Sequence, residues 1–552
     1  MEREEKGFKS RLGFILAAAG SAVGLGNLWS FPSKTAGNGG AAFVFVYVIM
    51  ALVIGVVAMI AEMYIGKRTG KNIIDSYRAC GKRFTWIGAL GVLSTTLIAS
   101  YYIVLGGWVL KYTCDYLVGN LEHVTNFAGY FGEFVSNSGT PILFMAIFFA
   151  IAMLILIFGV QNGIEKVSKV LMPVLLILIV VLMIRSLTLD PAGVQKGLEF
   201  YLKPDFSKMK PSSVLAAMGQ SFFSLSLGVG TMCVYGSYAK KHTGLAKSAL
   251  TVVILDTTVA LLAGFMIFPA IFASGLGEAE EVVSGGAGLF FIVMPQIFAT
   301  MKGGRFFGFL FFFLVFVAAI TSIISMVEVA LQTTIEKTKI KRPAAVGIFT
   351  VAIFLVGCLV SLSMGAVPQL QVNGLSLLDF LDMIIQTYVM PIGTVMACVI
   401  VGWVLNKQEL EQNFTSEKTR KVWLFLVKFI TPILVTVIFV FGMFGQNEEG
   451  KWGLANWRVT LTAFVLIATF VITNQVVVTV KQKKGLYREM IPALEGTDGT
   501  AILVENDSHE TDSDNTIIES DSDIAEETID TQDNKADSDT AQEQLVEEDT
   551  KE

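Results

Sequence analysis

Charged residues are scarce in this chain of 552 residues, of which only 16% are Asp, Glu, Lys or Arg. Soluble proteins carry about a quarter of such residues, so the composition argues against a water-soluble globular protein. Histidine is scarcer still: His123, His242 and His509 all lie away from the polar motifs described below. Because nucleophilic or metal-assisted catalysis needs a convergent set of such side chains, we expect neither an enzyme nor an organic cofactor.

Cysteine is also sparse, and its spacing indicates no chemistry. The five cysteines are odd in number and scattered, and they lack the spacing of metal ligands. We interpret them as small buried residues. They are Cys80, Cys114, Cys233, Cys358 and Cys398.

Hydrophobic residues, by contrast, make up 53% of the chain, and the mean hydropathy is +0.63. A helix needs about 20 apolar residues to cross the hydrocarbon core of a bilayer, and runs of this length recur along the sequence. We therefore predict an all-α polytopic membrane protein whose surroundings are the lipid bilayer and not nucleic acid. The twelve predicted transmembrane helices lie at about 12–37, 41–66, 86–118, 141–158, 166–188, 211–239, 246–274, 305–336, 344–363, 375–405, 421–445 and 457–481.

The few charges are distributed unevenly. Residues 491–552 hold 21 acidic residues and two lysines, which leaves 26 acidic and 39 basic residues elsewhere. Loops rich in Lys and Arg stay in the cytoplasm, which predicts a cell-membrane protein with both termini cytoplasmic. The loop 189–210 is an exception, because it places four lysines on the expected outer side. The basic loops of the expected inner side are 67–83, 240–247, 337–342 and 481–488.

These patterns divide the chain into three parts. Residues 1–11 are expected to form a cytoplasmic N-terminal segment, and residues 12–481 the membrane domain. Residues 482–552 are acidic and poor in apolar side chains, so they cannot bury enough surface to fold and are expected to be disordered. On the outer face, residues 279–301 are expected to form a short pair of capping helices.

Two short glycine motifs indicate an internal repeat. Gly24-Leu-Gly-Asn27 lies in the first span, and Gly228-Val-Gly-Thr231 lies in the sixth. Each motif begins a block of five spans, about 12–188 and 211–405, and the two blocks enter the membrane from opposite sides. This pattern is typical of an inverted repeat, in which two broken helices meet at a site near the middle of the membrane. The helices at about 421–481 are additional.

The first span contains three glycines within seven residues, each of which weakens a helix by about 1 kcal/mol relative to alanine. Where a helix unwinds inside the hydrocarbon layer, its free backbone N–H and C=O groups must bind protein, water or ligand. Its carbonyl groups suit a small hard cation, and the N-terminus of the next helix, at Leu25-Gly26, suits a carboxylate. Close helix packing through small residues is the alternative, but Asn27 adds a side-chain oxygen within the same turn. The glycines are Gly20, Gly24 and Gly26, and the carbonyls are those of Gly20, Ala22 and Val23.

Polar side chains interrupt three other apolar spans. Sodium prefers hard oxygen ligands, as other hard cations do, so hydroxyl groups from several helices could surround it with little fixed charge. The alternative is that each hydroxyl bonds to its own helix backbone. The polar groups are Gln220, Ser224 and Ser226 in span six and Thr321 and Ser322, which follow Ala318, in span eight.

Asp256 lies inside span seven, between Leu255 and Thr257. An ionisable residue at membrane depth indicates a function. Its carboxylate could bind a cation or supply a fixed negative charge, and a protonated structural aspartate is the alternative.

Together these residues resemble the neurotransmitter:sodium symporter family, in particular its bacterial sodium-dependent amino-acid transporters. The resemblance covers about residues 8–480 in order. Its most specific parts are Gly20-Ser-Ala-Val-Gly-Leu-Gly-Asn-x-Trp-x-Phe-Pro32, Asn38-Gly-Gly40 and Gln220-Ser-Phe-Phe-Ser-Leu-Ser-Leu-Gly-Val-Gly230. It implies an inverted repeat of five plus five helices, with broken helices 1 and 6, and sodium-driven uptake by alternating access.

The resemblance also implies which residues bind two sodium ions and the substrate. Sodium site 1 is expected to use Ala22, Asn27, Ser224 and Asp256 together with the substrate carboxylate. Sodium site 2 is expected to use Gly20, Val23, Ala318, Thr321 and Ser322. The substrate is expected to lie against Ser21, Ala22, Leu25, Gly26, Tyr102, Phe223, Ser224, Ser226, Val229, Ser322 and Met326.

The expected gates depart from the family pattern. Many relatives carry an arginine at position 30, which pairs with an acidic residue of span ten. This chain has Ser30 there, while Asp379 stands at the expected acidic position. Phe223 resembles the outer lid, and Tyr102 the hydroxyl that binds the substrate carboxylate. The inner latch is expected to use Ser237, Tyr238 and Glu336, with Arg3 or Lys6 as its cation.

We therefore expect a sodium-coupled symporter that imports a neutral amino acid with a hydrophobic or aromatic side chain. Chloride-dependent relatives place an anion near the position of Asp256, and a carboxylate there would repel a second negative charge. Ala260 also replaces a serine of that chloride site, so we expect chloride-independent transport. Two alternatives remain at this point: a proton-coupled transporter with Asp256 as the carrier, and an ion channel, although no span shows a continuous polar face.

Overall fold

The computed structural model describes residues 7–240, 243–275, 289–372, 374–405, 414, 416–446, 452–454 and 464–475. All of them belong to one compact unit, residues 1–486. The predicted acidic tail and the proposed latch cations Arg3 and Lys6 lie outside the described residues.

The elements of the first predicted repeat follow one another in chain order, with π-helical and 3₁₀ turns marked η. They are α2 (Arg11–Ala22), η1 (Gly26–Ser30), α3 (Phe31–Gly37), α4 (Ala41–Ile49), η2 (Met50–Gly55), α5 (Val56–Thr69), α6 (Ile73–Ala79), η3 (Lys82–Phe84), α7 (Thr85–Val118), η4 (Asn120–His123), α8 (Phe127–Ser136), α9 (Thr140–Ile157), η5 (Val160–Glu165), α10 (Lys166–Leu187), α11 (Pro191–Leu202) and η6 (Phe206–Lys208).

The second predicted repeat and the additional helices follow. They are α12 (Pro211–Ser224), α13 (Thr231–Ser237), α14 (Leu245–Ala273), η7 (Leu289–Val293), α16 (Met294–Thr300), α17 (Gly304–Thr338), α18 (Arg342–Ser363), η8 (Pro368–Leu370), α19 (Leu377–Ile384), η9 (Ile385–Val389), α20 (Met390–Val399), η10 (Ile400–Val404), α21 (Glu417–Phe425), η12 (Leu426–Ile430), α22 (Thr431–Met443), the antiparallel strands β1 (Phe444–Gln446) and β2 (Trp452–Leu454), and a helix at Phe464–Gln475.

Ten of the twelve predicted membrane spans are present in the described residues. Within the described ranges, nine helices are long and apolar enough to cross a bilayer, and α2 with α3 forms a tenth span that is bent by 47°. The sixth predicted span is divided into α12 and α13, and the twelfth is described only over Phe464–Gln475. The all-α polytopic fold is therefore confirmed, and the two interrupted spans are the two that carry the glycine motifs.

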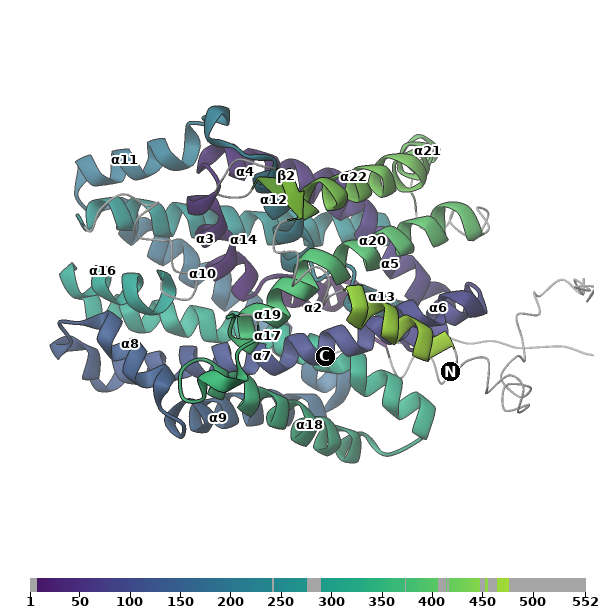
Figure 1. Ribbon diagram of the computed structural model, residues 1–552, viewed down its shortest axis with the longest axis horizontal. Coiled ribbons are helices and arrows are strands. Elements are labelled where there is room, and N and C mark those ends of the chain that lie inside the picture. Colours follow the sequence, from purple (N-terminus) through teal and green to yellow (C-terminus); the bar gives the residue numbers. More distant parts are fainter. Residues whose placement is uncertain are drawn as a thin grey trace, which may run out of the picture. The chain divides into compact units, whose positions relative to one another are not determined.

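The helix packing follows the symmetry of an inverted repeat. The helix α14 of span seven packs against α2 of span one, and α13 of span six packs against α5 of span two. In the inverted repeat, span one corresponds to span six and span two corresponds to span seven. Exchanging the two blocks therefore turns each of these contacts into the other. The helices α7 and α17, spans three and eight, pack along much of their length and lie beside one another in Figure 1. The broken spans are thus enclosed by helices from both repeats.

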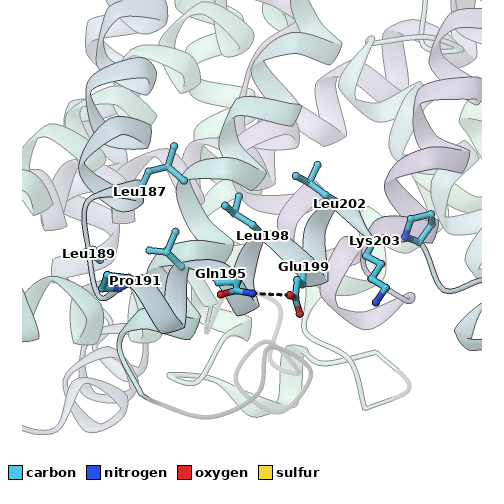
Figure 2. A pocket seen from close by; sticks show the side chains of 10 residues that line it. Leu187, Leu189, Pro191, Gln195, Leu198, Glu199, Leu202 and Lys203 are labelled. Atoms are coloured by element: carbon cyan, nitrogen blue, oxygen red, sulfur yellow. Dashed lines mark hydrogen bonds between the residues drawn. The ribbon is translucent and has the colours of Figure 1, made fainter.

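Short helices occupy two loops for which the sequence reading predicted no helix, α8 and α11. In α11 the carboxylate of Asp190 accepts a hydrogen bond from the backbone N–H of Gly193 at 2.9 Å, which caps a helix that begins with proline. Figure 2 shows Leu198 and Leu202 on one side of α11 and the hydrogen-bonded pair Gln195–Glu199 on the other. A pocket of about 630 Å³ lies along this helix, and it contains none of the predicted site residues. Of the predicted capping pair, η7 and α16 are described, and residues 276–288 lie outside the described ranges.

Candidate functional site

The first broken span leaves backbone groups without helical partners. The helix α2 ends at Ala22, and Val23 adopts an extended conformation with φ −72° and ψ 110°. The freed N–H of Gly24 donates to the side-chain oxygen of Asn27 at 3.0 Å, and the N–H of Leu25 donates to the Tyr102 hydroxyl at 3.2 Å. Side chains from the same turn and from α7 therefore satisfy the break, as membrane depth requires.

The second broken span separates α12 from α13 by six residues, 225–230. Gly228 has a φ of +79°, and a Cβ atom there would lie 2.1 Å from the carbonyl oxygen of Met390. Both the backbone conformation and this close approach exclude a side chain. The N–H of Gly228 donates to the Glu62 carboxylate at 2.5 Å, so span two helps to hold the break open.

Three residues of the predicted sodium site 1 meet between the two breaks. The amide nitrogen of Asn27 lies 2.7 Å from Oδ1 of Asp256 and 3.0 Å from Oγ of Ser224. The Ser224 hydroxyl also lies 2.9 and 2.8 Å from the two carboxylate oxygens of Asp256. Asn27 and Asp256 are fully buried. Ala22, the fourth predicted residue of this site, is also buried, as is its neighbour Val23. The structure therefore places a carboxylate, an amide and a hydroxyl from α14, η1 and α12 at one point.

The residues of the predicted sodium site 2 converge where α17 passes the first break. The hydroxyl of Ser322 lies 3.2 Å from the carbonyl oxygen of Val23 and 3.5 Å from that of Gly20. The hydroxyl of Thr321 lies 3.0 Å from the carbonyl oxygen of Ala318. These atoms are all hard oxygen donors of the kind that sodium prefers. Within the described residues, no three His, Cys, Asp or Glu side chains gather as metal ligands.

The predicted substrate residues surround the first break. A Cβ atom on Gly24 would lie 2.9 Å from the Tyr102 hydroxyl, and one on Gly26 would lie 3.2 Å from the ring of Phe223. The Phe223 ring is 8% exposed, so it is packed over the break. Ser226 donates to the carbonyl of Ser21 at 3.1 Å, and this bond joins span six to span one. Leu25, Val229 and Met326 are also buried.

The residues predicted for the outer gate do not face each other. The Ser30 hydroxyl donates to the side-chain oxygen of Gln220 at 2.7 Å, which directs it toward α12. Asp379 is exposed, and its carboxylate accepts a hydrogen bond from the Ser376 hydroxyl at 2.7 Å in the first turn of α19. Asp379 therefore lies in the capped first turn of α19, and its part in an outer gate stays a prediction.

The three predicted latch residues take part in two neighbouring groups of hydrogen bonds. Tyr238 donates to Glu328 at 2.7 Å, and the guanidinium of Arg342 binds the same carboxylate with both of its terminal nitrogens. Glu336 accepts from the backbone N–H of Asn72 at 2.7 Å. The Ser237 hydroxyl accepts from Gln332 at 2.9 Å, and Gln332 also donates to Glu336. Glu328 is fully buried, and the guanidinium of Arg342 is its ion-pair partner.

Two fully buried carboxylates, Glu62 and Glu328, were not predicted from the sequence. Both are ionisable residues inside apolar spans, which is the signal that identified Asp256. Applied to every span, the same rule would have found both. Their partners, the N–H of Gly228 and the guanidinium of Arg342, are distant in the sequence and could not be read from it.

Two interrupted spans that meet at buried oxygen atoms inside a bundle of apolar helices are typical of a secondary membrane transporter. The chain belongs to the sodium:neurotransmitter symporter family, whose sequence pattern matches residues 5–127 and 122–484. It is accordingly a sodium-dependent symporter, and the family is one of transporters and not of enzymes.

Three similar proteins show how far the likeness extends. The chain is 35% identical to the sodium-dependent transporter YhdH of Bacillus subtilis (strain 168), over 80% of this chain and 98% of that protein. It is 25% identical to the human sodium- and chloride-dependent GABA transporter 2, over 88% of each chain. The crystal structure of MhsT in complex with L-phenylalanine is 39% identical, covers 79% of this chain and 99% of its own, and has a TM-score of 0.74.

Proposed function

We propose that this symporter imports a neutral amino acid with a hydrophobic or aromatic side chain, coupled to two sodium ions and without need for chloride. The membrane domain, residues 12–481, carries the transport, and both termini lie in the cytoplasm of a cell-membrane protein. The transport cycle follows alternating access, with the two broken spans as the moving elements.

The observation that carries this proposal is the meeting of Asn27, Ser224 and Asp256 beside the break of span one. A cation at this point would find a carboxylate, two neutral oxygen atoms and the Ala22 carbonyl, and a bound amino acid would add its own carboxylate. The sodium ion and the substrate therefore share one coordination shell. Each ligand raises the affinity for the other, because binding free energies are reciprocally coupled.

The substrate end of the site supports an amino acid. The Tyr102 hydroxyl accepts a hydrogen bond from the N–H of Leu25, and its own O–H can donate to a carboxylate at this helix N-terminus, where a negative charge is favoured. Three of the other predicted contacts, Phe223, Val229 and Met326, have large apolar side chains, which favours a hydrophobic side chain on the substrate. The similar protein MhsT is in complex with L-phenylalanine.

Chloride independence rests on the carboxylate of Asp256. It supplies, inside the protein, the negative charge that an anion would otherwise bring. Ala260 lacks the hydroxyl group that a serine at this position would offer to an anion. Tyr47 lies 3.5 Å from the carboxylate, so the region of the expected anion site is already next to a negative charge.

The test is uptake of radiolabelled L-phenylalanine into proteoliposomes that contain the purified protein. An inward sodium gradient should drive accumulation, and a potassium gradient of the same size should not. Equal uptake under both gradients would remove the coupling to sodium. The rival proposal is a proton-coupled transporter, which the fully buried position of Asp256 favours. Accumulation driven by a pH gradient without sodium would establish that rival.

A further inference from the structure

A chain of side-chain hydrogen bonds joins span one to span ten at the end of the bundle opposite the inner latch. Lys34 lies in α3, one helical turn after Ser30. Its ammonium donates to the side-chain oxygen of Gln386 at 2.6 Å. The amide nitrogen of Gln386 in turn donates to the carboxylate of Asp382 at 2.6 Å. The two ends of this chain carry opposite charges, and the glutamine between them is neutral.

The chain of bonds ends next to the substrate residues. Tyr101 of α7 donates to the same oxygen of Asp382 at 2.9 Å. Its neighbour in the sequence is Tyr102, which binds the backbone of the first break. Lys34 and Asp382 are only partly buried, whereas Gln386 is 7% exposed and Tyr101 is 1% exposed. The network therefore joins spans one, three and ten at the boundary between the buried site and more exposed residues.

Within the described residues, the hydroxyl of Ser30 forms its hydrogen bond with α12 and not with span ten. The Ser30 hydroxyl donates to Gln220 at 2.7 Å, and the amide of Gln220 donates to the carbonyl of Gly26 at 2.7 Å. This arrangement ties both ends of η1 to α12. A cation that reaches span ten must therefore come from another position of span one, and Lys34 is the residue that does so.

We propose that Lys34, acting on Asp382 through the amide of Gln386, is the cation of the outer gate in this protein. The gate closes when the three side chains align, and it opens when span ten moves away from α3. The glutamine has a fixed polarity in this arrangement, since its oxygen faces the ammonium and its nitrogen faces the carboxylate. This proposal rests on the proposed function, because it assigns a gate to the same amino-acid site.

Gate opening should show in two independent measurements. The first is the rate at which bound radiolabelled L-phenylalanine leaves the purified protein in sodium. The second is backbone hydrogen exchange in residues 24–37 and 377–389, which does not depend on the identity of the substrate. Loss of one charge-assisted hydrogen bond is expected to accelerate dissociation by about tenfold or more.

The variants are chosen to separate a gate from a structural contact. Lys34→Ala and Gln386→Leu should each accelerate dissociation and hydrogen exchange, while sodium still activates binding. The double variant Lys34→Gln with Gln386→Lys places the ammonium directly beside Asp382, and it should restore slow dissociation. Lys203→Ala, which removes an exposed lysine at the end of α11, is the control and should change neither measurement.

The outcomes for the gate and for the proposed substrate are distinguishable. Unchanged dissociation and unchanged hydrogen exchange in Lys34→Ala would overturn the gate. Failure of the double variant to slow dissociation and exchange below the rates of Gln386→Leu would also overturn it. If the unsubstituted protein does not bind phenylalanine, the substrate proposal fails, and hydrogen exchange in the same variants decides the gate.

Discussion

Asn27 donates a hydrogen bond from its side-chain amide to the carboxylate of Asp256 at 2.7 Å, across 229 positions of the sequence. The oxygen of the same amide accepts the N–H of Gly24, which the break of span one has freed. One side chain therefore both stabilises the broken helix and reaches the buried carboxylate. A cation at this point would compete with the Asn27 amide for the oxygen atoms of Asp256 and Ser224, which links the fold of the break to ion binding.

Replacement of Asn27 by alanine is expected to weaken sodium activation. It removes the side-chain oxygen that is proposed to bind sodium in site 1. A polar contact to a charged group contributes about 1.5–3 kcal/mol, so the half-activating sodium concentration should rise by about tenfold or more. Uptake of phenylalanine measured against sodium concentration tests this, and an unchanged activation curve would remove Asn27 from the site.

Thr321 belongs only to the second proposed sodium site, so its replacement tests that site independently of the first. Thr321→Ala removes a hydroxyl that lies at the Ala318 carbonyl, and it should lower the affinity for sodium by about tenfold. Thr321→Ser keeps the hydroxyl and is the matched control, with sodium activation close to that of the unsubstituted protein. Equal activation curves for the two variants would show that this hydroxyl binds only its own helix.

Asp256→Asn should change the response to chloride. The unsubstituted protein is expected to transport equally well when gluconate replaces chloride, because the carboxylate already supplies the negative charge. The amide of the variant supplies none, so uptake should fall and become stimulated by chloride. Chloride dependence of the unsubstituted protein would contradict the proposal, whatever the variant does.

Glu328→Gln should open the inner end of the pathway. The substitution leaves the Arg342 guanidinium without a charged partner, and breaking a buried ion pair in this way costs about 3–5 kcal/mol. We expect faster hydrogen exchange in residues 231–238 and a lower melting temperature. The double variant Glu328→Gln with Arg342→Gln removes both charges and should recover part of the stability. If the double variant is no more stable than the single one, the two residues do not act as a pair.

Much of the fold was readable because its causes are local. Runs of about 20 apolar residues predicted the spans, and the glycines near Gly24 and Gly228 predicted both interruptions. The hydroxyls Thr321 and Ser322 could be linked to the first break only through the family resemblance. In the structure the Ser322 hydroxyl lies 3.2 Å from the carbonyl oxygen of Val23. This contact between distant helices could not be predicted from the composition of either span.

The sequence predicted Asp379 as the acidic residue of the outer gate, and Asp382 stands three positions later in the same predicted span. In the structure Asp379 belongs to the first turn of α19, where it pairs with Ser376, whereas Asp382 accepts from Tyr101. The contact with Tyr101 depends on the packing of α19 against α7, which residues close along the chain do not determine.

The sequence by itself determined that this chain crosses a membrane many times and that spans one and six are broken. Helix propensity and hydropathy depend on residues that are close along the chain, and these two properties follow from them. Only the tertiary structure decided that Asn27 reaches Asp256 and that Lys34 reaches span ten through Gln386. Those contacts depend on how distant helices are placed against one another, and that placement is set by the packing of the whole bundle.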